Sequence, residues 1–313
     1  MKINLKTKYS INKWILYGLL SVLIGVFVGV VDYIFSMGIT LVTNVRLANP
    51  IIFTALLPVA GLAIVYIYDR FGKGSQRGMG LVFSVGFGEE KKIPKRMVPF
   101  AIIATWLSHL FGGSVGREGV AVQIGADISQ NIGAKLPHKD ASRTFLITGM
   151  AAGFAGLFGT PIAATLFAIE VLTIGRIEYR ALYTSFIASF TASTVTHALG
   201  LTKSSFILGA DTSINGLMFF KLVALGTIFG LVGRIFAVLH LRGKAFFKKL
   251  VQNPLERVFI FGMFLSVCFI FLHHGRYSGL GESLVEAAFM GEKIYVYDWI
   301  LKMLLTIATL SVG

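Results

Sequence analysis

The chain has 313 residues, of which 55% are hydrophobic and 14% are charged, and its mean hydropathy is +0.76. Soluble globular domains carry about 25% charged residues, so this composition excludes an ordinary soluble protein and indicates an integral membrane protein. The net charge is +14, but the lysines and arginines cluster in short segments between apolar runs. This pattern is typical of cytoplasmic loops and argues against nucleic-acid binding.

Apolar runs follow one another along the chain, and several approach the roughly 20 residues that a membrane-spanning helix needs. The predicted helices lie at residues 14–31, 51–68, 97–116, 144–169, 181–202, 222–233, 258–275 and 303–313. The run 144–169 contains several glycines and Pro161, so we expect two helices there. Four lysines precede the first run (Lys2, Lys6, Lys8 and Lys13) and predict a cytoplasmic N-terminus. The first run is long enough to be a retained span, not a signal peptide.

An internal repeat is visible in the glycine pattern. Residues 25–31 resemble residues 226–232, and Gly78-Met79-Gly80 resembles Gly279-Leu280-Gly281, with 201 positions between the members of each pair. These landmarks predict two homologous halves, at residues 1–200 and 201–313, packed as inverted repeats around a substrate site. The second-half counterpart of Glu118 would fall at position 319. We therefore expect an incomplete second repeat and a natural protein longer by roughly 100 residues; a compact natural variant is the alternative.

One motif carries the chemistry of an ion pathway. Gly116-Arg117-Glu118-Gly119-Val120 follows one apolar run and opens the next predicted helix. Its glycines allow a sharp turn at membrane depth, and free N–H groups at a helix start favour an anion. A carboxylate inside a membrane costs on the order of 3 kcal/mol, so Glu118 marks a functional site. Glu118 can occupy an anion site as a tethered anion and leave it when protonated. A Glu118–Arg117 pair in an interfacial loop is the alternative, and Arg117 can equally make a structural contact.

These motifs resemble the CLC family of anion channels and proton-coupled antiporters, over essentially the whole chain. Gly-Arg-Glu-Gly followed by Val122-Gln123-Ile124-Gly125 is highly specific to that family, and residues 78–80, 159–170 and 278–281 resemble three further family segments. The resemblance implies an all-α polytopic membrane protein of two inverted repeats, with tilted and re-entrant helices. It also implies a homodimer in membrane lipid, with a pore in each subunit and Glu118 as the gating and proton-transferring residue. The implied anion-binding residues are Gly78, Met79, Gly80, Gly116, Arg117, Gly119 and Val120.

Departures from the family pattern favour one branch. Met79 stands where chloride members usually carry serine, and its thioether cannot donate a hydrogen bond. Val120 replaces the usual proline, and Val171 stands where chloride/proton antiporters carry an inward-facing glutamate. Together these residues resemble the fluoride/proton antiporter branch, which implies fluoride and protons as the transported ions and fluoride export across the cell membrane. The alternatives are a chloride channel or chloride/proton antiporter of the same fold, and a non-transporting truncated fragment.

Other side chains have simpler interpretations. Met79 by itself can be an apolar filler. The ring edge of Phe83 can touch an anion in the pathway, although core packing is the alternative. The sequence contains no Walker loop, His-Glu-x-x-His or Gly-x-Ser-x-Gly motif and no metal-ligand cluster, so it predicts no enzyme, no metal and no cofactor.

Overall fold

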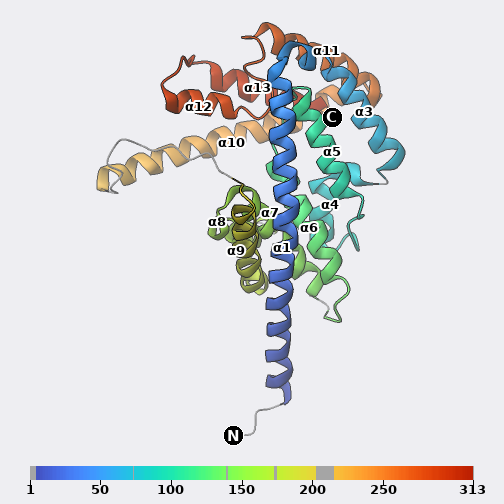
Figure 1. Cartoon of the computed structure of the whole chain (residues 1–313), viewed down its shortest axis with the longest axis vertical. Helices are drawn as coiled ribbons and strands as arrows, with labels where there is room; N and C mark the ends of the chain where they lie inside the picture. Colours follow the sequence, from blue (N-terminus) through green and yellow to red (C-terminus); the bar gives the residue numbers. More distant parts are fainter. Residues whose placement is uncertain (1–4, 73, 139, 173–174, 202–214, 313) are drawn as a thin grey trace. The chain divides into compact units, whose positions relative to one another are not determined.

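The computed structural model describes residues 5–72, 74–138, 140–172, 175–201 and 215–312 (Figure 1). Within these ranges the regular elements are helices and no strand occurs, so the prediction of an all-α fold is confirmed. The helices are α1 (Leu5–Ala48), α2 (Pro50–Ala55), α3 (Leu57–Phe71), η1 (Ser75–Arg77), α4 (Met79–Phe87), α5 (Met97–Leu110), α6 (Glu118–Gly133), α7 (Ala141–Phe158), α8 (Pro161–Val171), η2 (Tyr179–Ala181), α9 (Leu182–Ala198), α10 (Gly216–Leu250), α11 (Pro254–Phe271), α12 (Glu282–Met290) and α13 (Asp298–Val312).

Four helices in the described part of the chain are long and apolar enough to cross a membrane. They are Asn12–Ala48, Ala141–Phe158, Gly216–Leu250 and Pro254–Phe271, and α5 and α8 are shorter apolar helices. The apolar α10 has no buried residue along its 35 positions. A helix with apolar residues all round is typical of a membrane environment. The chain is therefore a multi-pass membrane protein.

The predicted helices are found, but their ends differ. The split in the run 144–169 is confirmed: α7 ends at Phe158, Gly159 has a positive φ of 61°, and Pro161 begins α8. The single helix expected at 51–68 is wrong, because the chain breaks at Leu56 between α2 and α3. The helix expected at 97–116 ends early, at Leu110, before Gly112 turns the backbone at a φ of 80°. Lys2, residue 202 and Gly313, which also figure in the predictions, lie outside the described residues.

The chain divides into two compact units, each made of separated segments. Unit 1 comprises Met1–Leu41, Ile67–Trp106 and Gly116–Lys203, and unit 2 comprises Val42–Tyr66, Leu107–Val115 and Ser204–Gly313. The main core of unit 1 joins α4, α6, α7 and α8 through buried side chains such as Val82, Val122, Met150 and Ala168. The core of unit 2 includes Leu57, Phe269, Tyr277 and Leu305. The division into halves at residues 1–200 and 201–313 stays a prediction.

The order of helices in the second half follows that in the first. The helices α4 and α12 each have nine residues. The next helices, α5 and α13, begin at Met97 and Asp298, which are again 201 positions apart. This spacing agrees with the repeat read from the glycine pattern.

Within unit 1, α6 and α7 pack with their backbones in contact. A methyl group on Gly125 would overlap the carbonyl oxygen of Gly149, and one on Gly153 would overlap that of Ala121. Small residues at helix interfaces permit this close approach in membrane proteins. The contact fixes the position of α6, the helix that begins with Glu118.

Candidate anion site

The first part of the candidate site is the N-terminus of α4. Gly78 is the N-cap and has φ 51° and ψ −130°, a conformation that strains residues with a side chain. The first bonds to its carbonyl come from Leu81 and Val82, at 3.0 and 3.4 Å. The N–H groups of Met79 and Gly80 therefore lie in the first turn, where a helix has no acceptor of its own for them.

The second part is the N-terminus of α6. Arg117 is the N-cap and Glu118 is the first helical residue. The first backbone bond to the N-cap carbonyl comes from Ala121, at 3.2 Å. The N–H groups of Glu118, Gly119 and Val120 precede this bond, so they form the positive end of the helix dipole.

These two N-termini meet. A Cβ atom on Gly119 would lie 3.8 Å from Met79 Cγ, and one on Gly78 would lie 3.3 Å from Gln123 Nε2. The first turns of α4 and α6 are thus brought together by residues that carry no side chain. Two helix N-termini at one place favour a bound anion, because both dipoles and several free N–H groups act on it.

The carboxylate of Glu118 folds back over Gly116. A Cβ atom on Gly116 would overlap Glu118 Oε2 and would lie 3.3 Å from its Cδ. Any side chain at position 116 would therefore displace the carboxylate from this position. Glu118 is exposed within unit 1 and lies in the first turn of α6, where a negative charge is stabilised by the dipole. The arrangement suits a tethered anion that can leave its place on protonation.

The remaining predicted residues divide into two groups. Met79, Phe83 and Val171 are partly buried and pack against the main core cluster of unit 1. Core packing is thus observed for Phe83, and its role in an anion pathway stays a prediction. Gly80 and Gly119 are exposed at the two helix starts, while Arg117 and Val120 are half-buried there.

Two polar neighbours were not predicted. Gln123, in the second turn of α6, faces Gly78. Arg77, directly before Gly78, donates to Ser84 Oγ at 2.8 Å and pairs with Glu90 at 3.0 Å. The sequence signal for Gln123 was a polar residue in an otherwise apolar helix start. Arg77 gave no signal because its partners are known only once α4 is folded. In the described part of the chain, no group of three or more His, Cys, Asp or Glu side chains could hold a metal ion.

Comparison with known proteins identifies the family. The family model for voltage gated chloride channels matches residues 60–313. The chain belongs to this family, the CLC family of anion channels and transporters.

Individual relatives have names that specify fluoride, chloride or both. The chain is 43% identical to a CLC-type fluoride/proton antiporter of known crystal structure, with a TM-score of 0.91, covering 99% of this chain and 77% of that one. It is 35% identical to a chloride/fluoride channel protein of Pseudomonas syringae pv. tomato, covering 97% of this chain and 68% of the relative. An H(+)/Cl(−) exchange transporter ClcA of Yersinia pestis is 30% identical over 87% of this chain and 61% of its own length.

A more distant structure shares the fold. A slow cyanobacterial Cl⁻/H⁺ antiporter is 19% identical to the chain and superposes with a TM-score of 0.76, covering 95% of this chain and 74% of that one. The chain thus spans between about three-fifths and three-quarters of the length of these four relatives.

Proposed function

We propose that this protein is a fluoride/proton antiporter that exports fluoride across the cell membrane. The observation that carries the proposal is the meeting of the α4 and α6 N-termini, with the Glu118 carboxylate folded over Gly116 beside them. The relatives at 43% and 35% identity, whose names include fluoride, support this substrate. The anion-binding residues would be Gly78, Met79, Gly80, Gly116, Arg117, Gly119 and Val120, with Phe83 beside the pathway.

The chemistry of fluoride fits these groups. Fluoride is small and strongly hydrated, so replacing its water requires donors that approach closely, and the N–H groups of the two first turns are such donors. The thioether of Met79 offers no competing hydroxyl. Fluoride is also a stronger base than chloride, so it can share a hydrogen bond with protonated Glu118. Protonation of Glu118 removes its charge and frees the anion site, which couples the two ions.

Proton coupling in this proposal does not need a second acidic residue. Val171 stands where the family resemblance expects the inward-facing glutamate, and it packs against the main core cluster of unit 1. An apolar residue there cannot carry a proton. In this scheme Glu118 alone exchanges its proton with each side in turn.

Chloride transport is the main alternative. It is supported by the relative from Yersinia pestis, whose name specifies chloride/proton exchange. Met79 and Val171 argue against it, because neither supplies the hydroxyl or the carboxylate of the chloride pattern. Channel activity and a non-transporting fragment are further alternatives.

The protein would act as a homodimer in membrane lipid, with a cytoplasmic N-terminus. The dimer is supported by exposed large apolar side chains on α8 and α9, including Ile162, Leu166, Phe186 and Phe190, because exposed apolar surface is available for contact with a second copy. The orientation is supported by the basic N-terminal residues. We assign the protein ion movement and no chemical conversion of a substrate.

Fluoride efflux from liposomes tests the proposal. The protein at its full natural length is reconstituted in vesicles loaded with fluoride, and an ion-selective electrode and a pH electrode record both ions. We expect fluoride efflux with opposite proton movement, little affected by chloride. Glu118→Gln, which cannot lose a proton, should abolish proton movement. Glu89→Gln, at an exposed position in the α4–α5 connection, is the matched control and should leave both fluxes unchanged.

Two results would overturn the proposal. Chloride efflux as fast as fluoride efflux would assign the protein to the chloride alternatives. Proton-coupled fluoride transport that persists in Glu118→Gln would remove Glu118 from its role.

A further inference from the structure

A half-buried lysine in unit 2 donates hydrogen bonds to three neutral oxygens. Lys302, in α13, donates from Nζ to Ser114 Oγ at 2.7 Å, to the carbonyl of Tyr277 at 3.0 Å and to the carbonyl of Gly279 at 2.5 Å. An ammonium group has three donors and no acceptor, so the three oxygens use its full capacity. Two of them belong to the loop before α12, and the third belongs to the segment Leu107–Val115.

This third oxygen is on a fully buried residue. Ser114 has no exposed surface, and its hydroxyl also lies 2.7 Å from that of Thr306, one turn after Lys302 on α13. Thr306 donates in turn to the Lys302 carbonyl at 2.7 Å. Lys302 and Thr306, one turn apart on α13, thus both contact Ser114, which lies 188 positions before Lys302 in the sequence.

The backbone joins the same segments. The N–H of Gly279 donates to the carbonyl of Gly112 at 3.1 Å. Both glycines have positive φ, 65° and 80°, which a residue with a side chain rarely adopts. The contact between the segment Leu107–Val115 and the loop before α12 is therefore built from both backbone and side-chain bonds.

A second cation, Arg46 in α1, contacts the same loop and is buried. Arg46 is 5% exposed and donates from Nη1 to Ser278 Oγ at 2.7 Å. A Cβ atom on Gly279 would lie 2.6 to 3.0 Å from the guanidinium atoms of Arg46. Arg46 and Lys302 therefore both contact Gly279.

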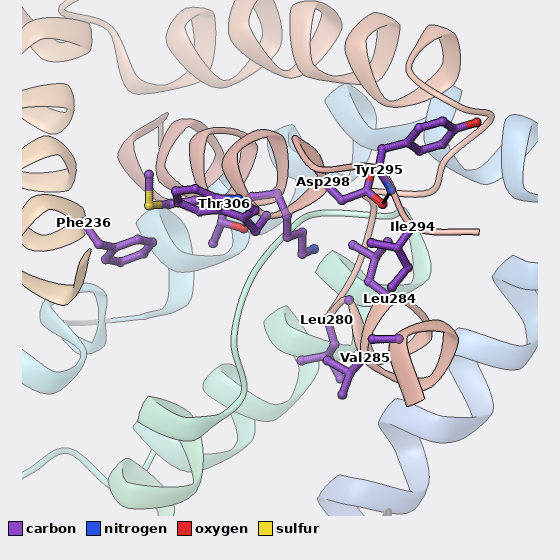
Figure 2. A pocket seen from close by; sticks show the side chains of 13 residues that line it. Phe236, Leu280, Leu284, Val285, Ile294, Tyr295, Asp298 and Thr306 are labelled. Carbon is purple, nitrogen blue, oxygen red and sulfur yellow. Dashed lines mark hydrogen bonds between the residues drawn. The ribbon is translucent and has the colours of Figure 1, made fainter. Parts of the chain in front are cut away.

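Neither cation has a carboxylate partner within ion-pair distance among the described residues. Asp298 lies on the same cavity of about 560 Å³ as Lys302 and Thr306, next to Tyr295 (Figure 2). Its carboxylate is already bound by Arg276 at 2.8 Å and by the Tyr277 hydroxyl at 2.5 Å. Taking two cations out of water without a carboxylate is costly, so global stability alone gives no reason for them.

The position of Ser114 in the sequence suggests the reason. Val115 follows it, and Gly116-Arg117-Glu118 comes next. The bonds of Lys302 thus fix the last residues before the candidate site. We propose that Lys302 is a positioning residue for anion transport, which clamps the segment Gly112–Val115 to the loop at Gly279 and so sets the backbone that enters the site at Glu118. This proposal rests on the proposed anion transport, but its structural part can be measured separately.

Amide hydrogen exchange and transport kinetics of the full-length protein test the clamp together. Lys302→Met keeps the length of the side chain and removes all three donors. We expect exchange at residues 112–116 and 277–281 to rise about tenfold, and the KM for fluoride to rise about tenfold with a smaller change in the maximal rate. Lys302→Arg, which keeps a cationic donor, should restore most of the affinity. Lys221→Met, at an exposed position of α10, should change neither quantity.

A second variant keeps the test valid if Lys302→Met does not fold. Ser114→Ala removes one acceptor and little volume. It should raise the amide exchange rate in the same segments, and the KM for fluoride, by a smaller factor. Unchanged exchange at residues 112–116 in the folded variants would overturn the clamp, as would an equal loss of rate with no change in KM. A wild-type protein that moves no fluoride, combined with faster exchange in Lys302→Met, would overturn the proposed function and support the clamp.

Discussion

Two glycine loops in this protein share a pattern and differ in what they bind. Gly78-Met79-Gly80 lies at the start of α4, and Gly279-Leu280-Gly281 precedes α12. Both helices have nine residues and end at a glycine with positive φ, Gly88 or Gly291. In the first loop the helix begins at the middle residue, Met79. In the second it begins two positions later in the pattern, at Glu282, after both glycines.

The difference decides which backbone groups each loop presents. At the first loop, the N–H groups of the starting helix meet the start of α6, which suits an anion. At the second, the Gly279 N–H is already bound to Gly112 and the Gly279 carbonyl accepts from Lys302. One pattern can thus present donors to an anion or acceptors to a cation, and residues distant in sequence determine the outcome.

The largest difference between the two loops should appear in how much the ion pair beside each one contributes to the free energy of unfolding. Arg77–Glu90 is about half exposed, with side-chain exposures of 50% and 48%, whereas Arg276–Asp298 has 24% and 7%. Asp298 also accepts from the Tyr277 hydroxyl and the Tyr295 N–H. We expect Asp298→Asn to lower the free energy of unfolding by about 3 kcal/mol and Glu90→Gln by less than about 1 kcal/mol. Thermal unfolding in detergent measures both, and equal losses would remove the contrast.

Substituting one glycine of each loop with alanine tests how the two loop backbones differ in their surroundings. Gly78 and Gly279 both have positive φ, so alanine should cost about 1 kcal/mol at either position. At Gly279 the methyl group would also displace the buried Arg46, whereas at Gly78 it would meet the mobile end of Gln123 at 3.3 Å. We expect a total loss of about 3 kcal/mol for Gly279→Ala. The same unfolding assay measures it, and a larger loss for Gly78→Ala would contradict this account.

Serine at the middle position of each loop tests function. Met79→Ser introduces a hydroxyl donor at the start of α4, and one hydrogen bond changes affinity by about fivefold to tenfold. We expect the preference for fluoride over chloride in liposome efflux to fall by that factor. Leu280→Ser should leave the preference unchanged, because α12 begins after that position. A similar shift in both variants would mean that the two loops contribute alike.

The smallest expected effect is a pH dependence confined to the second loop. Burial raises the pKa of Asp298, but hydrogen bonds from Tyr277, the Tyr295 N–H and Arg276 outweigh it, so the pKa lies below its usual value. Such a carboxylate stabilises the fold above its unfolded pKa of about 4 and loses this contribution as the pH falls through its folded pKa. The unfolding temperature should therefore drop on acidification below about pH 4, and less so in Asp298→Asn. If the unfolding temperature falls equally with pH in the wild type and in Asp298→Asn, Asp298 is not the source of the pH dependence.

The sequence predicted the local features of the site better than its contacts. The position of Glu118 at the start of α6 follows from glycines beside apolar runs, which are local signals. The break at Gly159 and Pro161 was predictable for the same reason. Met79 was recognised between two glycines, but the sequence did not predict that α4 begins there.

The end of α5 at Leu110 was missed, because no charge interrupts the run 97–116 and the expected helix was continued through Gly112 and Gly113. Gly112 instead turns the backbone at a φ of 80°.

Long-range contacts were beyond prediction for a physical reason. The bond between Lys302 and Ser114 joins residues 188 positions apart, and nothing near either residue indicates the other. The fold of the Glu118 carboxylate over Gly116 is a side-chain torsion, which glycine permits but does not specify.

The close contact of α6 and α7 has a consequence for how the protein works. Gly125 and Gly149 leave no layer of side chains between the helices. No flexible side chains are therefore present there to rearrange if one helix were to slide or tilt against the other. A tightly packed interface of this kind deforms little. The moving part at the start of α6 would then be a few bonds in one glutamate side chain, which rotate while the helix stays still. Such a device needs little space and displaces little lipid, so its speed should depend weakly on the thickness of the surrounding bilayer.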